Sequence, residues 1–304
     1  MRAIQATVER PVQCRGVGLH SGVAVAMSLL PAPPDSGIRV RRTDVSPETG
    51  EIPARLAHVV NARLSTVIGN RHGVTVATVE HLMAALAGMG VDNAVVALDG
   101  PEIPAMDGSA TPFVELIERA GIRDLGTRRR AIRVRKPLSV DNGESSISMM
   151  PADAFSIEFQ IEFDSPVIAR QARCIEFANG AFVDDIAPAR TFGFVDDVER
   201  LRRAGFARGA SLDNAIAIDR ERVVNPDGLR FDDEFVRHKI LDCVGDLYLA
   251  GAPILARVVA MRSGHAANHD LLRAMFADRN SWDWWDIPRE DTADETPLAA
   301  RAFG

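Results

Sequence analysis

Three polar side chains recur at four-residue spacing within residues 237–246: His238, Asp242 and Asp246. Apolar residues stand between them, so the segment predicts a helix with these three groups on one face, about one turn apart. An imidazole and a carboxylate on adjacent turns can bind one metal ion, and Lys239 brings a cation to the same place. Because burying such groups without partners is costly, either a metal or hydrogen-bonding partners are expected.

A second candidate pair is Glu80 and His81, near the start of an apolar segment at 79–88 that predicts a helix begun by Thr78. Alone, the pair also fits favourable charges at a helix N-terminus. Together with His238 and Asp242, His81 would complete a three-ligand site with a fourth position open to water, as in catalytic rather than structural zinc sites. Glu80 would then flank the metal as a general base.

A third candidate is His265, which follows a predicted strand and precedes a predicted helix. Gly264 lets the backbone approach closely, and a loop histidine at this place is free to titrate. Asp246 is positioned to orient His265 and keep it cationic, as a carboxylate does for an imidazolium. A helix-capping histidine is the alternative interpretation.

A hydroxyl donor is offered by Thr191, which stands between Arg190 and the phenyl rings of Phe192 and Phe194. A hydroxyl in this setting suits an oxyanion donor beside an apolar groove. The glycine-rich segment 16–22 lacks the GxGxxG spacing and a following helix pattern, so it predicts a tight turn rather than a dinucleotide loop.

Composition limits the class of protein. A chain of 304 residues is long enough for two domains, and 46% hydrophobic with 25% charged residues is ordinary for a globular protein. The net charge of −7 argues against a nucleic-acid partner, which needs a basic face, but permits an anionic small molecule. Three scattered cysteines without CxxC spacing predict neither disulfides nor a thiolate zinc site.

The start of the sequence lacks an apolar core of signal-peptide length, and no run approaches the roughly 18 apolar residues of a spanning helix. We therefore expect a cytoplasmic protein without stable membrane insertion, which can still act on an amphiphile. Nothing in the sequence points to an obligate protein partner.

The order of predicted elements repeats. Strands, a helix, a buried strand and a helix occur once in each half, which predicts an α+β fold of two similar domains, 1–126 and 127–304. A basic stretch at 123–136 between them suits a solvated linker. Residues 189–223 look like an insertion, with a helix near 196–204 and a strand near 215–218. The expected strands are 6–13, 23–30, 37–42, 59–68, 94–98, 131–140, 145–150, 156–163 and 254–261, and the remaining helices are 112–120, 233–249 and 268–277.

Five motifs in this order resemble the UDP-3-O-acyl-N-acetylglucosamine deacetylases, the zinc amidases that commit Gram-negative bacteria to lipid A synthesis. The resemblance runs from about residue 6 into the tryptophan-bearing tail, nearly the full length, and five linked motifs are far more specific than one. The motifs are TVEHL at 78–82, MDGSA at 106–110, ARTFG at 189–193, RHKILDCVGD at 237–246 and SGH at 263–265.

The resemblance implies helices packed between two outer sheets, an insertion in each domain, and a catalytic Zn²⁺ at the domain junction. It implies an amidase of the EC 3.5.1 class that hydrolyses the N-acetyl group of UDP-3-O-(3-hydroxyacyl)-N-acetylglucosamine and releases acetate. By motif, the metal ligands are His81, His238 and Asp242, the water-activating base is Glu80, the acid is His265 with Asp246 as its partner, and the oxyanion donor is Thr191.

The resemblance also implies substrate contacts. Lys239, counted among the catalytic residues as well, and Arg262 match cations near the diphosphate, and Phe163 matches a ring that stacks on uracil. The residues expected to line the acyl passage are Leu19, Phe192, Phe194 and those at 211–218. The turn 141–144 carries an acid where the family suggests a lysine, so nucleotide contacts from it are left out.

Two other functions remain open at this stage. Another metal amidase or peptidase is disfavoured because no histidine stands four residues after His81, so HExxH is absent. A noncatalytic binding module with a structural helix pair is the other. The sequence leaves undetermined the preferred acyl-chain length, the metal loaded in the cell (zinc or iron) and the oligomeric state.

Overall fold

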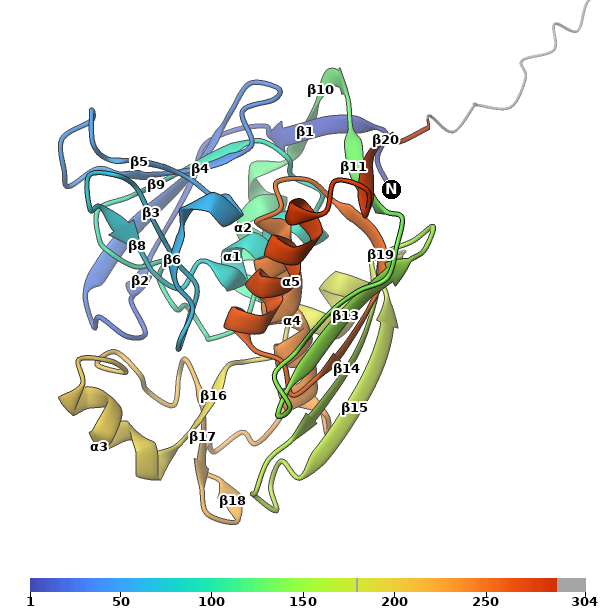
Figure 1. Ribbon diagram of the computed structural model, residues 1–304. Coiled ribbons are helices and arrows are strands. Elements are labelled where there is room, and N and C mark those ends of the chain that lie inside the picture. Colours follow the sequence, from blue (N-terminus) through green and yellow to red (C-terminus); the bar gives the residue numbers. More distant parts are fainter. Residues whose placement is uncertain (179, 289–304) are drawn as a thin grey trace, which may run out of the picture.

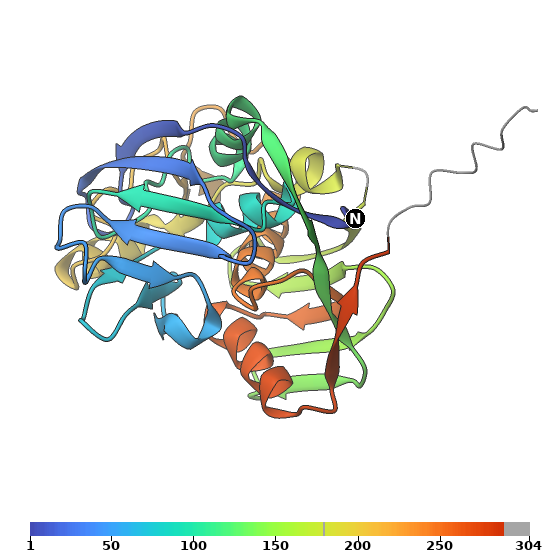
Figure 2. The ribbon, with the colours of Figure 1, turned by 90° about the horizontal axis from the view of Figure 1, so that it is seen from above.

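The computed structural model of the protein describes residues 1–178 and 180–288. Two mixed sheets form its outer layers and the main helices fill the space between them (Figure 1). The view from above in Figure 2 shows the same separation of the sheets by helices. The predicted α+β fold with helices between outer sheets is therefore confirmed. Residues 289–304 of the predicted second domain lie outside the described residues.

The two main sheets share one topology. In the first, β9 has an antiparallel neighbour, β3, and a parallel neighbour, β4, and these pair outward with β2 and β5. In the second, β19 lies between antiparallel β13 and parallel β14, which pair outward with β12 and β15. The bounds are β2 Val12–Val17, β3 Ala24–Pro31, β4 Ile38–Arg42, β5 Glu51–Pro53, β9 Ala94–Leu98, β12 Leu138–Asp141, β13 Ser146–Pro151, β14 Ser156–Glu162, β15 Arg170–Glu176 and β19 Ile254–Met261.

Each half also carries its extra elements at the same point of the repeat, between an antiparallel hairpin (β4–β5 or β14–β15) and its first long helix. In the first half these are η1 (Leu56–His58) and a small sheet of β6 (Val59–Asn61), β7 (Val67–Gly69) and β8 (Thr75–Val76). In the second half they are η2 (Phe182–Ile186), α3 (Val195–Arg203) and a small sheet of β16 (Phe192–Phe194), β17 (Ile216–Asp219) and β18 (Arg222–Val223).

The central helices are α1 (Glu80–Gly88), α2 (Thr111–Ala120), α4 (Glu234–Tyr248) and α5 (His265–Ala277). Both α1 and α4 are buried around nearly their whole circumference, as expected of helices packed between two sheets. The polar residues that they bury must therefore satisfy one another or a ligand.

Close contact between α1 and α4 depends on Gly245. A Cβ atom built on Gly245 would lie 2.0 Å from the backbone oxygen of Glu80. Only a residue without a side chain permits this approach, which brings the first turn of α1 against the middle of α4. The local sequence thus fixes how near His81 comes to Asp242.

Several predicted boundaries are wrong. Residues 6–13 form two strands, β1 (Ile4–Val8) and β2, and residues 59–68 are split into β6 and β7. Thr78 is not the cap of α1, because its hydroxyl donates to Glu102 instead, at 2.8 Å. His265 is the first residue of α5 rather than a loop residue, so α5 begins three residues earlier than predicted.

The predicted linker at 123–136 is also wrong. This stretch forms β10 (Ile122–Arg128), which pairs with β1, and then β11 (Arg130–Val134), which joins the second main sheet between β19 and β20 (Trp282–Asp286). The apolar residues Ala131, Ile132 and Val134 are buried while the arginines of β10 stay outside, so a charged sequence can still be a strand. The domain boundary at 126/127 stays a prediction.

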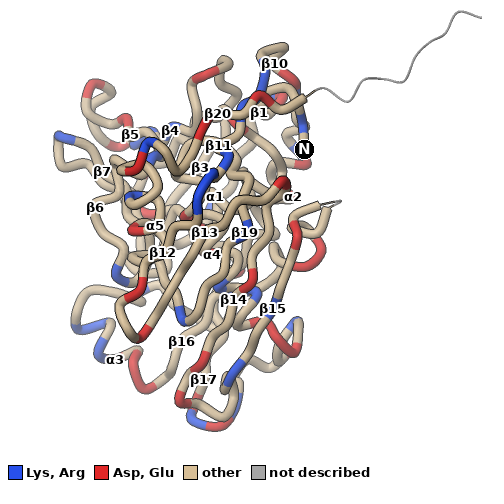
Figure 3. The backbone as a smooth tube through the Cα atoms, turned by 45° about the vertical axis from the view of Figure 1, so that its right-hand side comes forward, with Lys and Arg blue, Asp and Glu red and all other residues tan. Residues whose placement is uncertain are grey.

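Charged residues of both signs are intermixed along the outer strands and loops (Figure 3). Among the described residues, no helix combines the length and apolar character needed to cross a membrane.

Candidate active site

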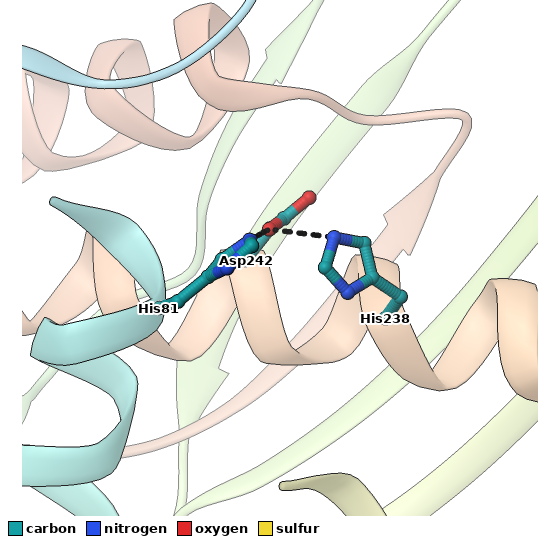
Figure 4. A group of neighbouring side chains, drawn as sticks. All are labelled: His81, His238 and Asp242. Atoms are coloured by element: carbon teal, nitrogen blue, oxygen red, sulfur yellow. Dashed lines mark ion pairs between the residues drawn. The ribbon is translucent and has the colours of Figure 1, made fainter. Parts of the chain in front are cut away.

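The side chains of His81, His238 and Asp242 converge where α1 meets α4 (Figure 4). The Nε2 atoms of His81 and His238 lie 3.5 and 3.4 Å from Oδ1 of Asp242, and the three ligand atoms are all within 4.8 Å of one another. The imidazole rings meet edge to face with centroids 4.9 Å apart. All three residues are buried, so this is an enclosed cluster of two nitrogens and one oxygen.

Hydrogen bonds orient two of these three side chains, His238 and Asp242. Nδ1 of His238 is 3.1 Å from the backbone oxygen of Ala189, which places the proton on Nδ1 and leaves Nε2 free to ligate. Oδ2 of Asp242 accepts from Nζ of Lys239 at 2.6 Å, whereas Oδ1 is buried and has no hydrogen-bond partner. An orphaned buried carboxylate oxygen facing two imidazole nitrogens is a fitting place for a cation.

The carbonyl that orients His238 is itself held firmly. Arg190, next to Ala189, donates from Nε and Nη2 to the two carboxylate oxygens of Glu234 at 2.8 and 3.1 Å. Glu234 is fully buried at the start of α4. This bidentate pair ties the segment before β16 to the helix that carries the ligands.

The charges of the cluster suit metal binding. Burial lowers the pKa of His238 to about 4, so its imidazole is neutral and can act as a ligand. Burial alone would raise the pKa of Asp242, but His238, Lys239 and His81 together hold it well below its ordinary value. The site therefore presents two imidazoles and one carboxylate near neutral pH.

Glu80 and His265 face each other beside this cluster. Oε1 of Glu80 lies 3.8 Å from Nε2 of His265, and Nδ1 of His265 is 2.8 Å from Oδ2 of Asp246. Burial raises the pKa of Glu80 to about 7. Burial opposes the charge of His265, but Asp246, Glu80 and Asp242 outweigh it and raise its pKa to about 9. A carboxylate and an imidazolium with these values suit a base and an acid in one reaction.

Three residues around Asp246 were not identified from the sequence. Asn268 donates from Nδ2 to Oδ2 of Asp246 at 2.8 Å, and the hydroxyl of Thr66 lies 2.5 Å from Oδ1. His269, interpreted from the sequence as an ordinary first-turn residue, is fully buried with Nε2 2.9 Å from the Thr66 hydroxyl. Asn268 and His269 are neighbours in the sequence, but Asn268 is 22 residues from Asp246 and Thr66 is 180 residues away, so no local spacing connects them to Asp246.

The aromatic residues form one cluster next to the ligands. The ring of Phe192 packs edge to face on Phe163 at 5.8 Å, on Phe235 at 5.0 Å and on His238 at 6.2 Å, and Phe163 lies 6.2 Å from Phe194. The predicted phenyl rings are thus brought together beside the candidate metal site.

Family comparison agrees with this arrangement. The sequence model of the family described as LpxC, UDP-3-O-acyl N-acetylglycosamine deacetylase, matches residues 5–277. The chain belongs to this deacetylase family. Proteins named UDP-3-O-acyl-N-acetylglucosamine deacetylase from Shewanella baltica and Shewanella oneidensis are 46% and 45% identical to it over 288 and 291 residues. These matches cover 94% and 95% of each chain.

Lys239 and Arg262, the two cations predicted to lie near the diphosphate of the substrate, line one cavity with Phe163. Its volume is about 330 Å³, and the full lining is Ile161, Glu162, Phe163, Asp164, Lys239, Arg262 and Ser263. The turn 141–144, left out of the predicted site, is the exposed tip of the hairpin of β12 and β13.

Leu19 and Thr191 lie at the edges of the insertion. Leu19 is in the turn between β2 and β3, where Gly22 has a φ of 69°, as the predicted tight turn requires. The Leu19 carbonyl accepts from the backbone of Gly209, which joins this turn to the insertion. Thr191 follows Ala189 by two residues and donates its backbone N–H to Gly108. Contact of either side chain with substrate stays a prediction.

His20, in the same turn, packs edge to face on Phe206 at 5.7 Å and lies near enough to the site to sense its charges. Burial lowers its pKa against the pull of Glu102, and the charges of His265 and His81 lower it further. The buried Glu102 also accepts from the backbone N–H groups of His20 and Ser21, so one carboxylate fixes the turn against the start of α1.

Proposed function

We propose that this chain is a zinc-dependent deacetylase that hydrolyses the N-acetyl group of UDP-3-O-(3-hydroxyacyl)-N-acetylglucosamine, releasing acetate and leaving a free amine. This reaction is the committed step of lipid A biosynthesis. The single observation that carries the proposal is the convergence of His81, His238 and Asp242 next to Glu80 and His265, in a chain of the deacetylase family.

The donor set and its spacing support zinc. Tetrahedral zinc with bonds of about 2.0–2.2 Å requires ligand atoms about 3.4 Å apart. The separations of 3.4 and 3.5 Å to Oδ1 of Asp242 match this requirement. Zinc held there supplies a Lewis acid and lowers the pKa of bound water to about 7.

Glu80 and His265 divide the proton transfers. The carboxylate of Glu80, adjacent in sequence to a ligand, takes a proton from the attacking water. The imidazolium of His265, kept charged by Asp246, gives a proton to the nitrogen of the leaving amine. Amide cleavage needs both transfers, because an unprotonated amine is a poor leaving group. Thr191 assists by donating its hydroxyl to the oxyanion.

The surroundings separate the polar and apolar ends of the substrate. Lys239 and Arg262 hold the sugar and diphosphate, and Phe163, which lines the same cavity, stacks against the uracil. The acyl chain lies along Phe192 and Phe194, with Leu19 and residues 211–218 at the far side of its passage. A cytoplasmic location, where all three cysteines stay free thiols, belongs to this proposal.

The test is a deacetylase assay on metal-depleted protein with stoichiometric addition of Zn²⁺. We expect activity to vanish on depletion and to return fully at one equivalent of zinc. His238→Ala should not regain activity at that concentration. Equal activity of depleted and loaded protein would refute the metal mechanism, and full recovery only with Fe²⁺ would refute the assignment of zinc.

A further inference from the structure

Thr66 directly precedes β7 of the small sheet in the first half and is fully buried. Each of its polar atoms is used. Its backbone N–H donates to Oε2 of Glu80 at 3.1 Å and its carbonyl accepts from the backbone of Val79 at 3.3 Å. Its hydroxyl contacts Asp246 and His269 at 2.5 and 2.9 Å. One residue therefore touches the candidate base and the partner of the candidate acid.

The direction of the hydroxyl bonds follows from proton counting. The carboxylate of Asp246 can only accept, so the single proton of the Thr66 hydroxyl points to Oδ1. The hydroxyl oxygen then accepts from Nε2–H of His269. Nδ1 of His269 is buried without a partner, so a proton there would be an unsatisfied donor. His269 is therefore a neutral imidazole with its proton on Nε2, and burial accordingly lowers its pKa.

We propose that Thr66, oriented by His269, is a positioning residue that sets the geometry of both proton-transferring groups of the deacetylase. The chain of donors runs from His269 to Thr66 to Asp246, whose other oxygen receives His265 and Asn268. Asp246 thus has donors on both oxygens and cannot rotate without losing one. The position of His265 follows from that of Asp246.

The two contacts of Thr66, its backbone N–H to Glu80 and its hydroxyl to Asp246, can be separated experimentally. Thr66→Val has nearly the same shape and keeps the backbone N–H to Glu80, but it removes the donor to Asp246. Removing such an outer hydrogen bond typically costs 10- to 100-fold in activity. The loss should fall on kcat with KM and zinc content unchanged, because Thr66 touches neither the ligands nor the substrate cavity. Thr66→Ser, which keeps the hydroxyl, should restore most of kcat.

Thr7→Val is the matched control for the loss of a buried hydroxyl. Thr7 is fully buried and its hydroxyl accepts from the backbone of Ala32 at 3.0 Å, within the first half. It should lower the melting temperature and leave kcat unchanged. If Thr66→Val lowers only the melting temperature, or if Thr66→Ser loses as much kcat as Thr66→Val, the positioning role is overturned.

A second pair of variants covers the case in which Thr66→Val does not fold. His269→Gln keeps an N–H close to the place of Nε2, whereas His269→Leu removes it. A kcat for His269→Leu well below that of His269→Gln supports the positioning role of Thr66 and His269, and equal values overturn it. This inference rests on the proposed function. An inactive zinc-loaded wild type would refute that function, whereas an active wild type with fully active variants would refute the positioning role alone.

Discussion

Replacing Gly245 with alanine tests whether the contact between α1 and α4 builds the metal site. The new Cβ would lie 2.0 Å from the Glu80 oxygen, whereas ordinary contact begins at 3.4 Å. The two backbones must therefore separate by about 1.4 Å, the difference between these distances. A metal site tolerates errors of only about 0.2 Å in its ligand distances, and His81 moves with Glu80. We expect zinc affinity to fall by at least the 10- to 100-fold typical of a disturbed outer shell.

Whether Gly245→Ala stabilises or destabilises the protein shows which of two effects dominates, helix propensity or overpacking. Alanine in place of glycine inside a helix would by itself stabilise the protein by about 1 kcal/mol. Overpacking at a buried crossing costs about 1–3 kcal/mol, so the net effect should be destabilising. Zinc affinity is measured by competition with a chelator, and stability by denaturant unfolding of the metal-free protein.

Gly193→Ala is the matched control, because no atom lies within 4 Å of the Cβ position and its φ is not in the left-handed region. It should leave zinc affinity unchanged. If Gly245→Ala binds zinc like the wild type and is more stable, then the close crossing does not determine the site.

Three further predictions concern the roles of single side chains. Glu80→Ala should keep zinc and lose turnover by orders of magnitude, measured as metal content and kcat; near-normal turnover would rule out Glu80 as the base. Asp246→Asn should move the alkaline limb of the pH–rate profile to lower pH than in the wild type, because Asp246 raises the pKa of His265 and the imidazolium loses this main carboxylate; an unmoved limb would contradict the pairing. Arg262→Ala should raise KM with little change in kcat, because its proposed contact is with a part of the substrate distant from the reacting amide; a loss confined to kcat would place it at the chemistry.

The wild-type profile should be bell-shaped, since Glu80 must be ionised and His265 protonated. The rate rises through the pKa of Glu80, about 7 without a metal, and falls through that of His265, about 9. A bound divalent cation favours the carboxylate and disfavours the imidazolium, so both limbs of the loaded enzyme should lie below these metal-free values. A profile flat on both limbs would contradict a mechanism with two titrating groups.

The sequence predicted best those features whose residues lie close together along the chain. His238 and Asp242 are four residues apart on one helix, so periodicity alone places them on one face. The repeated order of elements also survives in the sequence, because each half alternates strands and helices in the same way, and five strands pair in the same order in both main sheets, with β11 and β20 added to the second. Element ends were less certain, since Pro11 and the arginines of β10 obscure the strand pattern.

The network around Asp246 could not be read in the same way. Thr66 is 180 residues from Asp246 and 203 from His269 in the sequence, and a lone threonine between short strands has no periodicity. Such a residue acquires its role only when the small sheet of the first half is packed against α4 and α5. Thr66 is recognised only in the folded structure, where its buried hydroxyl contacts two polar side chains.

The equivalence of α1 and α4 explains why the chemistry lies between them. Each helix precedes the central strand of its own sheet, and each is covered on both sides, so water is largely excluded where they touch. In that environment one cause, burial, raises the pKa of Glu80 and lowers that of His238, while His265 keeps its charge because it has a dedicated carboxylate in Asp246. The unpaired oxygen of Asp242 is the one group of the cluster that these contacts leave unsatisfied, so a metal should bind there and also stabilise the contact between the two halves.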